Sequence, residues 1–161
     1  MISLGIDPGT ATTGYGVIKK VGDDFICLEY GTIETDKNLS TSSRLYSLHK
    51  NISSLIKKYS PDLFAVESLF FFKNLKTALP VSQAKGVIML TAEINKINVF
   101  EFTPLQVKMA VTGYGKAEKK QVQEMIKLTL NLEKIPRPDD AADALGVALC
   151  AVIKKTSLTD L

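Results

Sequence analysis

Four carboxylates lie at positions where an acidic side chain needs a partner. Asp7 and Glu67 each stand at or near the C-terminal end of a short apolar run, in the stretches ISLGID and LFAVES. A charge at such a place is costly without a partner, and two neighbouring carboxylates repel each other. A divalent cation removes both difficulties, because hard cations prefer oxygen ligands. If the two strands pair in one sheet, the two residues predict a metal site.

The segment PDDAAD supplies the other two candidates. Asp140 and Asp143 are three residues apart, so they share one face of a helix. Asp139 is explained well as an N-cap, but Asp143 lies a turn inside the helix among alanines and a leucine. Together with Asp7 and Glu67, these residues could hold two Mg²⁺ ions for phosphodiester hydrolysis. One ion would activate the attacking water and the other would stabilise the leaving oxygen.

The elements that must position these carboxylates begin with an antiparallel meander of three strands. Turns at Pro8-Gly9 and Gly22-Asp23 would join the strands. Alternating helices and strands follow, which predicts an α/β fold with a mixed five-stranded sheet flanked by helices in one domain. We expect Pro80 to occupy the first position of the second long helix. The expected strands cover 2–7, 14–20, 25–35, 63–68 and 99–104; the expected helices cover 45–59, 81–96, 105–111, 119–130 and 139–155.

The totals fit a single domain over residues 1–155 with a short tail over 156–161. The chain has 161 residues, of which 45% are hydrophobic and 23% charged, so it can form an ordinary core. Its apolar runs are too short to cross a membrane, and Met1 leads directly into a strand-like segment, so we expect no secretory leader. We therefore expect a cytoplasmic protein with no membrane partner, in which Cys27 and Cys150 are reduced thiols.

Basic residues are concentrated between Lys108 and Arg137. The net charge of the chain is only +3, and the excess within this stretch is larger than that of the whole. A local basic surface suits a polyanion, although on charge alone a solvated helix face is the more ordinary explanation. The basic residues are Lys108, Lys116, Lys119, Lys120, Lys127, Lys134 and Arg137; the acidic ones are Glu118, Glu124 and Glu133.

Five motifs in fixed order resemble the RuvC family of bacterial Holliday-junction resolvases. They are GIDPGTATTGYGVI, AVESLFFFKN, QAKGV, AEKKQV and PDDAADALGVA, and they cover nearly the whole chain. The resemblance implies an RNase H-like fold, a homodimer, and Mg²⁺-dependent nicking of two opposing strands of four-way junction DNA in recombination and repair. It also implies work with a branch-migration motor complex, and Mn²⁺ is an alternative to Mg²⁺.

The resemblance also assigns site residues by motif. Asp7 matches the family's first-strand aspartate, Glu67 its central-strand glutamate, and Asp143 the aspartate of the AADAL segment. Asp140 matches the remaining catalytic position, so the four are expected to be both catalytic residues and metal ligands. The doubled Asp139-Asp140 departs from the family pattern and leaves open which of the two reaches the metal. We favour Asp140, because it shares the helix face of Asp143.

Four residues are expected to contact DNA. Phe70, Lys108 and Lys119 match family positions at the DNA surface, and Lys85 lies where a basic residue is usual. An aromatic ring at the rim of the site can stack on an unpaired base, worth about 1–3 kcal/mol, and lysines bind phosphates. Without the resemblance, the run Phe70–Phe72 is typical of a core and any one lysine of a solvated charge.

Three other functions remain open from the sequence. DPGT with Gly14 and Gly16 resembles the phosphate-binding hairpin of sugar kinases and actin-like ATPases, but 161 residues supply only one of the two domains those proteins need. A relative of the same fold that processes ribosomal RNA precursors is another possibility. A third is a module that binds junctions without cutting, which the set of four acidic residues argues against. His49, far from every carboxylate, is interpreted as structural.

Overall fold

The structure of this chain is a computed structural model that describes residues 1–9, 11–68 and 75–157. Phe70 and the last four residues of the expected tail fall outside the described residues. Within the described ranges, no helix is both long enough and apolar enough to cross a membrane.

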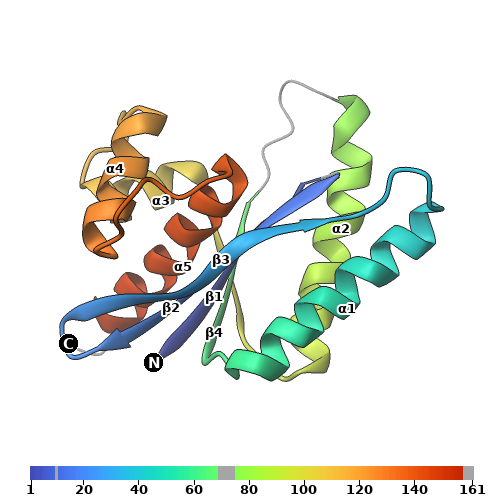
Figure 1. Cartoon of the computed structure of the whole chain (residues 1–161), viewed down its shortest axis with the longest axis horizontal. Coiled ribbons are helices and arrows are strands. Elements are labelled where there is room, and N and C mark those ends of the chain that lie inside the picture. The colour runs from blue at the N-terminus through green and yellow to red at the C-terminus, as the bar shows by residue number, and fades with distance from the viewer. Residues whose placement is uncertain (10, 69–74, 158–161) are drawn as a thin grey trace.

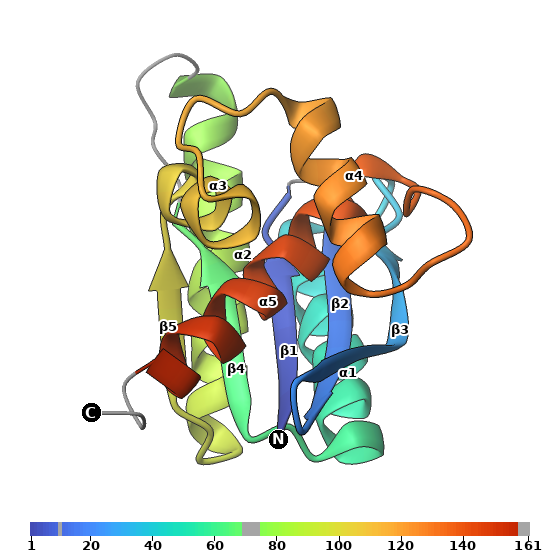
Figure 2. The ribbon, with the colours of Figure 1, turned by 90° about the vertical axis from the view of Figure 1, so that its left-hand side faces the viewer.

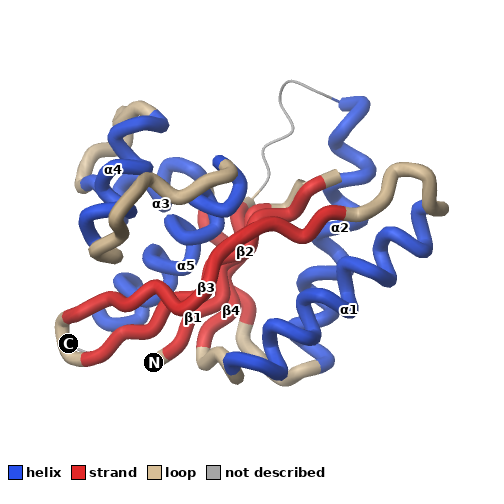
Figure 3. Tube along the Cα trace, viewed as in Figure 1, coloured by secondary structure: helices blue, strands red, loops and turns tan. Residues whose placement is uncertain are grey.

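A mixed sheet of five strands forms the centre of the molecule (Figures 1 and 3). β1 (Ile2–Asp7) pairs antiparallel with β2 (Thr12–Val21) and parallel with β4 (Leu63–Glu67). β3 (Asp24–Glu34) pairs antiparallel with β2, and β5 (Val99–Phe102) pairs parallel with β4. The order β3-β2-β1-β4-β5 confirms the predicted mixed five-stranded sheet.

Helices cover both faces of this sheet (Figures 1 and 2). α1 (Thr41–Tyr59) and α2 (Leu75–Ile94) lie on one face. α5 (Asp139–Ser157) crosses the other face, with α3 (Pro104–Thr112) and α4 (Lys119–Thr129) packed against it. Each face has its own buried apolar cluster, so the sheet is the shared wall of two cores.

α5 lies unusually close to the central strands. Its middle is almost entirely buried, and small residues of the sheet face it. A Cβ added at Gly5 of β1 would stand 2.2 Å from the carbonyl oxygen of Ala144, closer than any real contact. Glycine is therefore required where the helix backbone meets the strand, and this close approach fixes where the acidic start of α5 lies.

α2 begins earlier than expected, and the prediction for Pro80 was wrong. Pro80 lies inside α2, which starts at Leu75, rather than at the first position of the helix. An interior proline removes one backbone hydrogen bond. The buried Ala84, Ile88 and Ala92 follow at four-residue spacing and pack α2 onto the sheet, which stabilises the helix in spite of the proline.

α5 begins at the expected residue, but it differs from the expectation in the role of Asp139 and at its C-terminal end. Asp139 is its first helical residue rather than the cap that precedes it. At the other end, the helix continues beyond Lys155 to Ser157, through the first two residues of the predicted tail. Thr156 Oγ1 donates to the carbonyl of Val152 at 2.9 Å, a bond within the last turns of the helix.

Candidate active site

Asp7 and Glu67 lie side by side at the ends of β1 and β4. The strands are parallel with Ile6 opposite Val66, so each carboxylate is the next residue along its own strand. Successive side chains point to opposite faces of a sheet. Because Ile6 and Val66 pack into the core beneath α1 and α2, Asp7 and Glu67 point to the face that α5 covers. The prediction that sheet pairing would place these strand ends next to each other is confirmed.

α5 brings two further carboxylates to the same place. Gly14 is the β2 partner of Asp7, and a Cβ at Gly14 would lie 2.0 Å from the carbonyl oxygen of Asp140. The first turn of α5 therefore rests on the strand pair beside Asp7. Asp143 lies one turn further along, and its charge acts on both Asp7 and Glu67. The four carboxylates that the sequence singled out thus share one region.

Burial and the crowding of these carboxylates raise the pKa values of several members of the group. Burial, with the charges of Glu67 and Asp143, raises the pKa of Asp7 to about 8. Burial and the charge of Asp143 raise the pKa of Glu67, although a hydrogen bond with Asp7 opposes the rise. Burial also raises the pKa of Asp143, partly offset by Lys119. The site therefore holds more negative charge than the surrounding protein balances.

The group fits a hard divalent cation by the chemistry of its donors, which are all carboxylate oxygens in partly buried positions. In the described ranges, no three acidic, histidine or cysteine side chains converge into a ready-made metal-binding cluster. Asp143 is turned toward Lys119, whose Nζ lies 3.0 Å from Oδ2. In this conformation a lysine ammonium supplies part of the positive charge that the carboxylates require.

Asp139 and Asp140 have different surroundings. The Asp139 carboxylate accepts hydrogen bonds from Arg137 and from Gln123 Nε2, the latter at 3.1 Å, and lies 3.2 Å from Lys119 Nζ. The bonds from Lys119 and Gln123 hold its pKa below the usual range. Asp140 instead acts electrostatically on Asp7. This arrangement favours Asp140 over Asp139 as the ligand, as expected, while the ligand role itself stays a prediction.

Two of the predicted DNA-binding lysines border the carboxylates. A pocket of about 250 Å³ has Glu67, Asp143, Lys108 and Lys119 around it. Burial would lower the pKa of Lys119, but its bonds to Asp143 and Asp139 raise it overall. The floor of the pocket is apolar and consists of Pro104, Val107, Val122, Ile126 and Gly146. Anionic and cationic groups thus meet around one apolar hollow.

Lys85 lies elsewhere. Its ammonium forms an ion pair with Glu101 of β5, and only 19% of its side chain is exposed. Glu101 is opposite Val66 in the sheet, so it belongs to the face away from α5. Ser68 Oγ, next to Glu67 in the chain, lies 3.5 Å from the same carboxylate. Lys85 is therefore tied to the sheet end rather than aimed at the carboxylate pocket.

Sequence reasoning did not find the residues that orient Asp139. Gln123 and Arg137 come from α4 and from the loop before α5, and both bind its carboxylate. The only sequence signal was the departure from the family pattern at Asp139-Asp140. The supporting partners depend on how α4 packs on α5, which residue types and spacing do not reveal.

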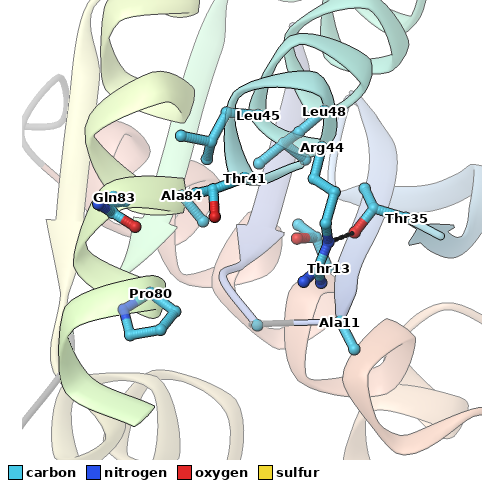
Figure 4. A pocket seen from close by; sticks show the side chains of 11 residues that line it. Ala11, Thr13, Thr35, Thr41, Arg44, Leu45, Leu48, Pro80, Gln83 and Ala84 are labelled. Atoms are coloured by element: carbon cyan, nitrogen blue, oxygen red, sulfur yellow. Dashed lines mark hydrogen bonds between the residues drawn. The ribbon is translucent and has the colours of Figure 1, made fainter. Parts of the chain in front are cut away.

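A second pocket, of about 120 Å³, lies on the opposite face between α1, α2 and the loop after β1 (Figure 4). Arg44 reaches into it, and its Nε donates to Thr35 Oγ1 at 3.0 Å. The remaining wall is largely Leu45, Leu48 and Ala84. None of the four carboxylates borders this pocket, so the chemistry of the site belongs to the α5 face.

Carboxylates at the ends of β1 and β4, joined by acidic residues from a helix across a mixed sheet of this order, define a nuclease of the RNase H-like fold. The family model for crossover junction endodeoxyribonuclease RuvC matches residues 3–151. The chain belongs to the RuvC family and is thus a phosphodiester-cleaving enzyme of DNA. Enzymes of this family generally need divalent metal ions.

Individual relatives agree with the family assignment. The crossover junction endodeoxyribonuclease RuvC of Natranaerobius thermophilus is 55% identical over 150 residues, which is 93% of either chain. The Thermus thermophilus RuvC structure superposes with a TM-score of 0.91 at 30% identity, over 99% of this chain and 98% of that one. T. thermophilus RuvC in complex with Holliday junction substrate gives a TM-score of 0.89 at 28% identity, over 98% of this chain and 96% of that one.

Proposed function

We propose that this chain resolves Holliday junctions in recombination and repair, by paired and symmetric Mg²⁺-dependent nicks. The observation that carries the proposal is the gathering of Asp7, Glu67 and Asp143 beside Lys108 and Lys119 at the ends of the central strands β1 and β4. Carboxylates bind the metal and lysines bind the DNA phosphates, which is what a phosphodiesterase needs. The relationship to a RuvC solved with junction DNA supports the choice of substrate.

The site residues divide the work by their positions. Asp7, Glu67, Asp140 and Asp143 would hold two Mg²⁺ ions, which when bound supply an activated water and stabilise the leaving oxygen. Lys108 and Lys119 lie at the rim of the same pocket, where they hold the backbone of the cleaved strand. Phe70 is proposed, by family likeness alone, to stack on an unpaired base of the junction.

The enzyme would act as a homodimer, because two opposing strands of a two-fold junction require two symmetric sites. The two long helices on one face of the sheet, α1 and α2, are the candidates for the dimer interface, and α2 offers the better surface. Its residues Leu79, Leu90 and Ile94 are each more than half exposed, and Gly86 has open space before it. A second copy of α2 would cover this apolar stripe. We further propose a cytoplasmic enzyme that works beside a branch-migration motor.

The experiment is cleavage of a labelled four-way junction with a movable centre, next to a linear duplex of the same sequence and a structured RNA. We expect Mg²⁺-dependent symmetric nicks near the crossover in the junction alone. Junction binding without nicks would replace the enzyme with a binding module. Cleavage of the RNA in preference to the junction would overturn the choice of substrate.

A further inference from the structure

The loop between α3 and α4 presents an aromatic ring that neither core uses. Tyr114 is 57% exposed and stands between Gly113 and Gly115. Gly113 has the left-handed φ of +71° that ends α3, a conformation that glycine adopts without strain. A Cβ at Gly115 would lie 2.7 Å from Leu105 Cδ1, so the loop backbone packs closely on the side chains of α3 at this point. The loop is thus built around Tyr114 without burying it.

The backbone of Tyr114 is fixed by hydrogen bonds at both of its polar groups. Its N–H donates to Thr112 Oγ1 at 3.1 Å, and the same hydroxyl lies 3.0 Å from its carbonyl and 2.8 Å from that of Lys108. The N–H of Ala117 also donates to the Tyr114 carbonyl, at 3.1 Å. Because the backbone that carries the ring is already ordered, binding a ligand there costs less conformational entropy than ordering a flexible loop would.

A groove of about 490 Å³ adjoins the ring. Tyr114 and Met125, which is 37% exposed, supply apolar surface, and Ala117 forms part of the floor. This volume falls within the range of sites that hold compounds the size of a nucleoside. An aromatic ring can stack on the face of any base, and a methionine thioether also packs well against aromatic rings. Such a contact requires no particular DNA sequence.

The groove and the carboxylate pocket are neighbours across the start of α4. Lys119 borders the pocket and lies 3.0 Å from Asp143, while the next residue, Lys120, borders the groove. Lys116 stands in the loop itself, two residues from Tyr114. The charged residues that border the groove are Lys120, Glu118 and Glu124, so the groove itself is not basic, and the further positive charge near it comes from Lys116. DNA is favoured as the occupant because the groove adjoins the carboxylate pocket, where the proposed function places the cleaved strand.

We propose that Tyr114 and its groove are an additional DNA-contact site, in which the ring stacks on a base or deoxyribose of the strand that leaves the carboxylate pocket. Lys116 and Lys120 bind the phosphates on either side of the stacked residue. The inference rests on the proposed function for its ligand, junction DNA. It goes beyond that function by assigning a binding role to a residue outside the site residues expected from the family.

The chain contains no tryptophan, which allows a direct probe. Tyr114→Trp introduces a single tryptophan into the groove, and we expect its fluorescence to be quenched when unlabelled junction DNA is added without divalent metal. Tyr46→Trp is the matched control, because Tyr46 is 64% exposed on α1, which lies on the other face of the sheet. Its fluorescence should not respond to the same DNA.

The affinity for junction DNA and its salt dependence distinguish a stacking contact of Tyr114 from a charge contact of Lys120. Tyr114→Ala should weaken junction binding about 5- to 150-fold, equivalent to about 1–3 kcal/mol, whereas Tyr114→Phe should bind like the wild type. The slope of log Kd against log salt should not change in Tyr114→Ala, since no charge is removed. Lys120→Ala should reduce that slope by about one. Tyr46→Ala should leave both quantities unchanged.

The outcomes distinguish this inference from the proposed function. If the wild type cuts junctions but Tyr114→Trp is not quenched and Tyr114→Ala binds normally, the groove inference is wrong and the function stands. If the wild type neither binds nor cuts junctions, the proposed function fails and the inference fails with it. If Tyr114→Ala binds DNA normally but changes the oligomeric state, the groove is a protein interface and the inference is overturned.

Discussion

Two clusters of ionisable side chains in this fold are built in opposite ways. On the face toward α1, Glu29 of β3 accepts hydrogen bonds from Tyr15 at 3.0 Å, from Lys58 at 2.6 Å and from Tyr59. At the sheet end under α5, Asp7 is surrounded by Glu67, Asp140 and Asp143. Glu29 is therefore surrounded by hydrogen-bond donors, whereas Asp7 is surrounded by other carboxylates.

As a result, the pKa shifts of Glu29 and Asp7 have opposite directions. Hydrogen bonds from Lys58 and Tyr59 lower the pKa of Glu29, whereas burial and like charges raise that of Asp7 to about 8. The Glu29 carboxylate links α1 to the sheet, and its hydrogen-bond donors already stabilise its negative charge. A cluster that is short of positive charge costs stability by itself, which indicates a site kept for binding. The comparison therefore offers a physical criterion, beyond residue type, for predicting which acids are structural and which bind a ligand.

The largest predicted effect is on junction cleavage, when one acid from each of the two clusters is neutralised in turn. Glu67→Gln should reduce junction cleavage to background, because a ligand charge at the metal site is lost while the shape is kept. Glu29→Gln should cut junctions at the wild-type rate and lose only about 1 kcal/mol of unfolding free energy, since the cluster is partly exposed. Gel-based cleavage and thermal unfolding measure the two quantities. Normal cleavage by Glu67→Gln would remove the basis of the comparison.

The pH dependence of stability should have opposite signs at the two clusters. Asp7 has a raised folded pKa, so between about 4 and 8 the folded protein binds the extra proton. Metal-free stability from this residue is therefore lost as pH rises through that window, and Asp7→Asn should be more stable than the wild type at pH 8. Glu29 has a lowered pKa, so its contribution is present above about pH 4.5 and is lost on acidification. Chemical denaturation at several pH values would show both trends.

Added Mg²⁺ should stabilise the wild type by mass action, because the metal binds the folded cluster and not the unfolded chain. At concentrations about 100-fold above the dissociation constant the gain is about 2.7 kcal/mol. Asp7→Asn should show a much smaller rise in Tm, while Glu29→Gln should respond like the wild type. An equal rise in all three proteins would mean that the ion binds elsewhere.

Much of this site could be predicted from strand ends and helix spacing. Acidic residues that close apolar strands can meet only if the strands are neighbours, and the meander followed by a parallel crossover makes β1 and β4 neighbours. The three-residue spacing of Asp140 and Asp143 likewise follows from helix geometry. These predictions depend on local periodicity, which sequence expresses directly.

The contacts that could not be predicted from the sequence are those between segments far apart in the chain. The start of α2 was misplaced because Pro80 was given more weight than the buried stripe of Ala84, Ile88 and Ala92, whose contacts come from the sheet. The partners of Asp139 are on α4 and on the loop before α5, and the partner of Lys85 is on β5. No pattern within one segment reports a contact made by another, so these pairings were out of reach.

The smallest predicted effect concerns the lysines and tests whether position or charge alone decides a DNA contact. Lys108 borders the carboxylate pocket, whereas Lys85 is mostly buried and already paired with Glu101. Lys108→Ala should reduce the salt dependence of junction binding by about one unit of slope, because one phosphate contact is lost. Lys85→Ala should leave that slope unchanged and lower stability instead, since Glu101 loses its partner. A reduction of the slope in Lys85→Ala as large as that in Lys108→Ala would show that Lys85 contacts DNA, as the sequence predicted.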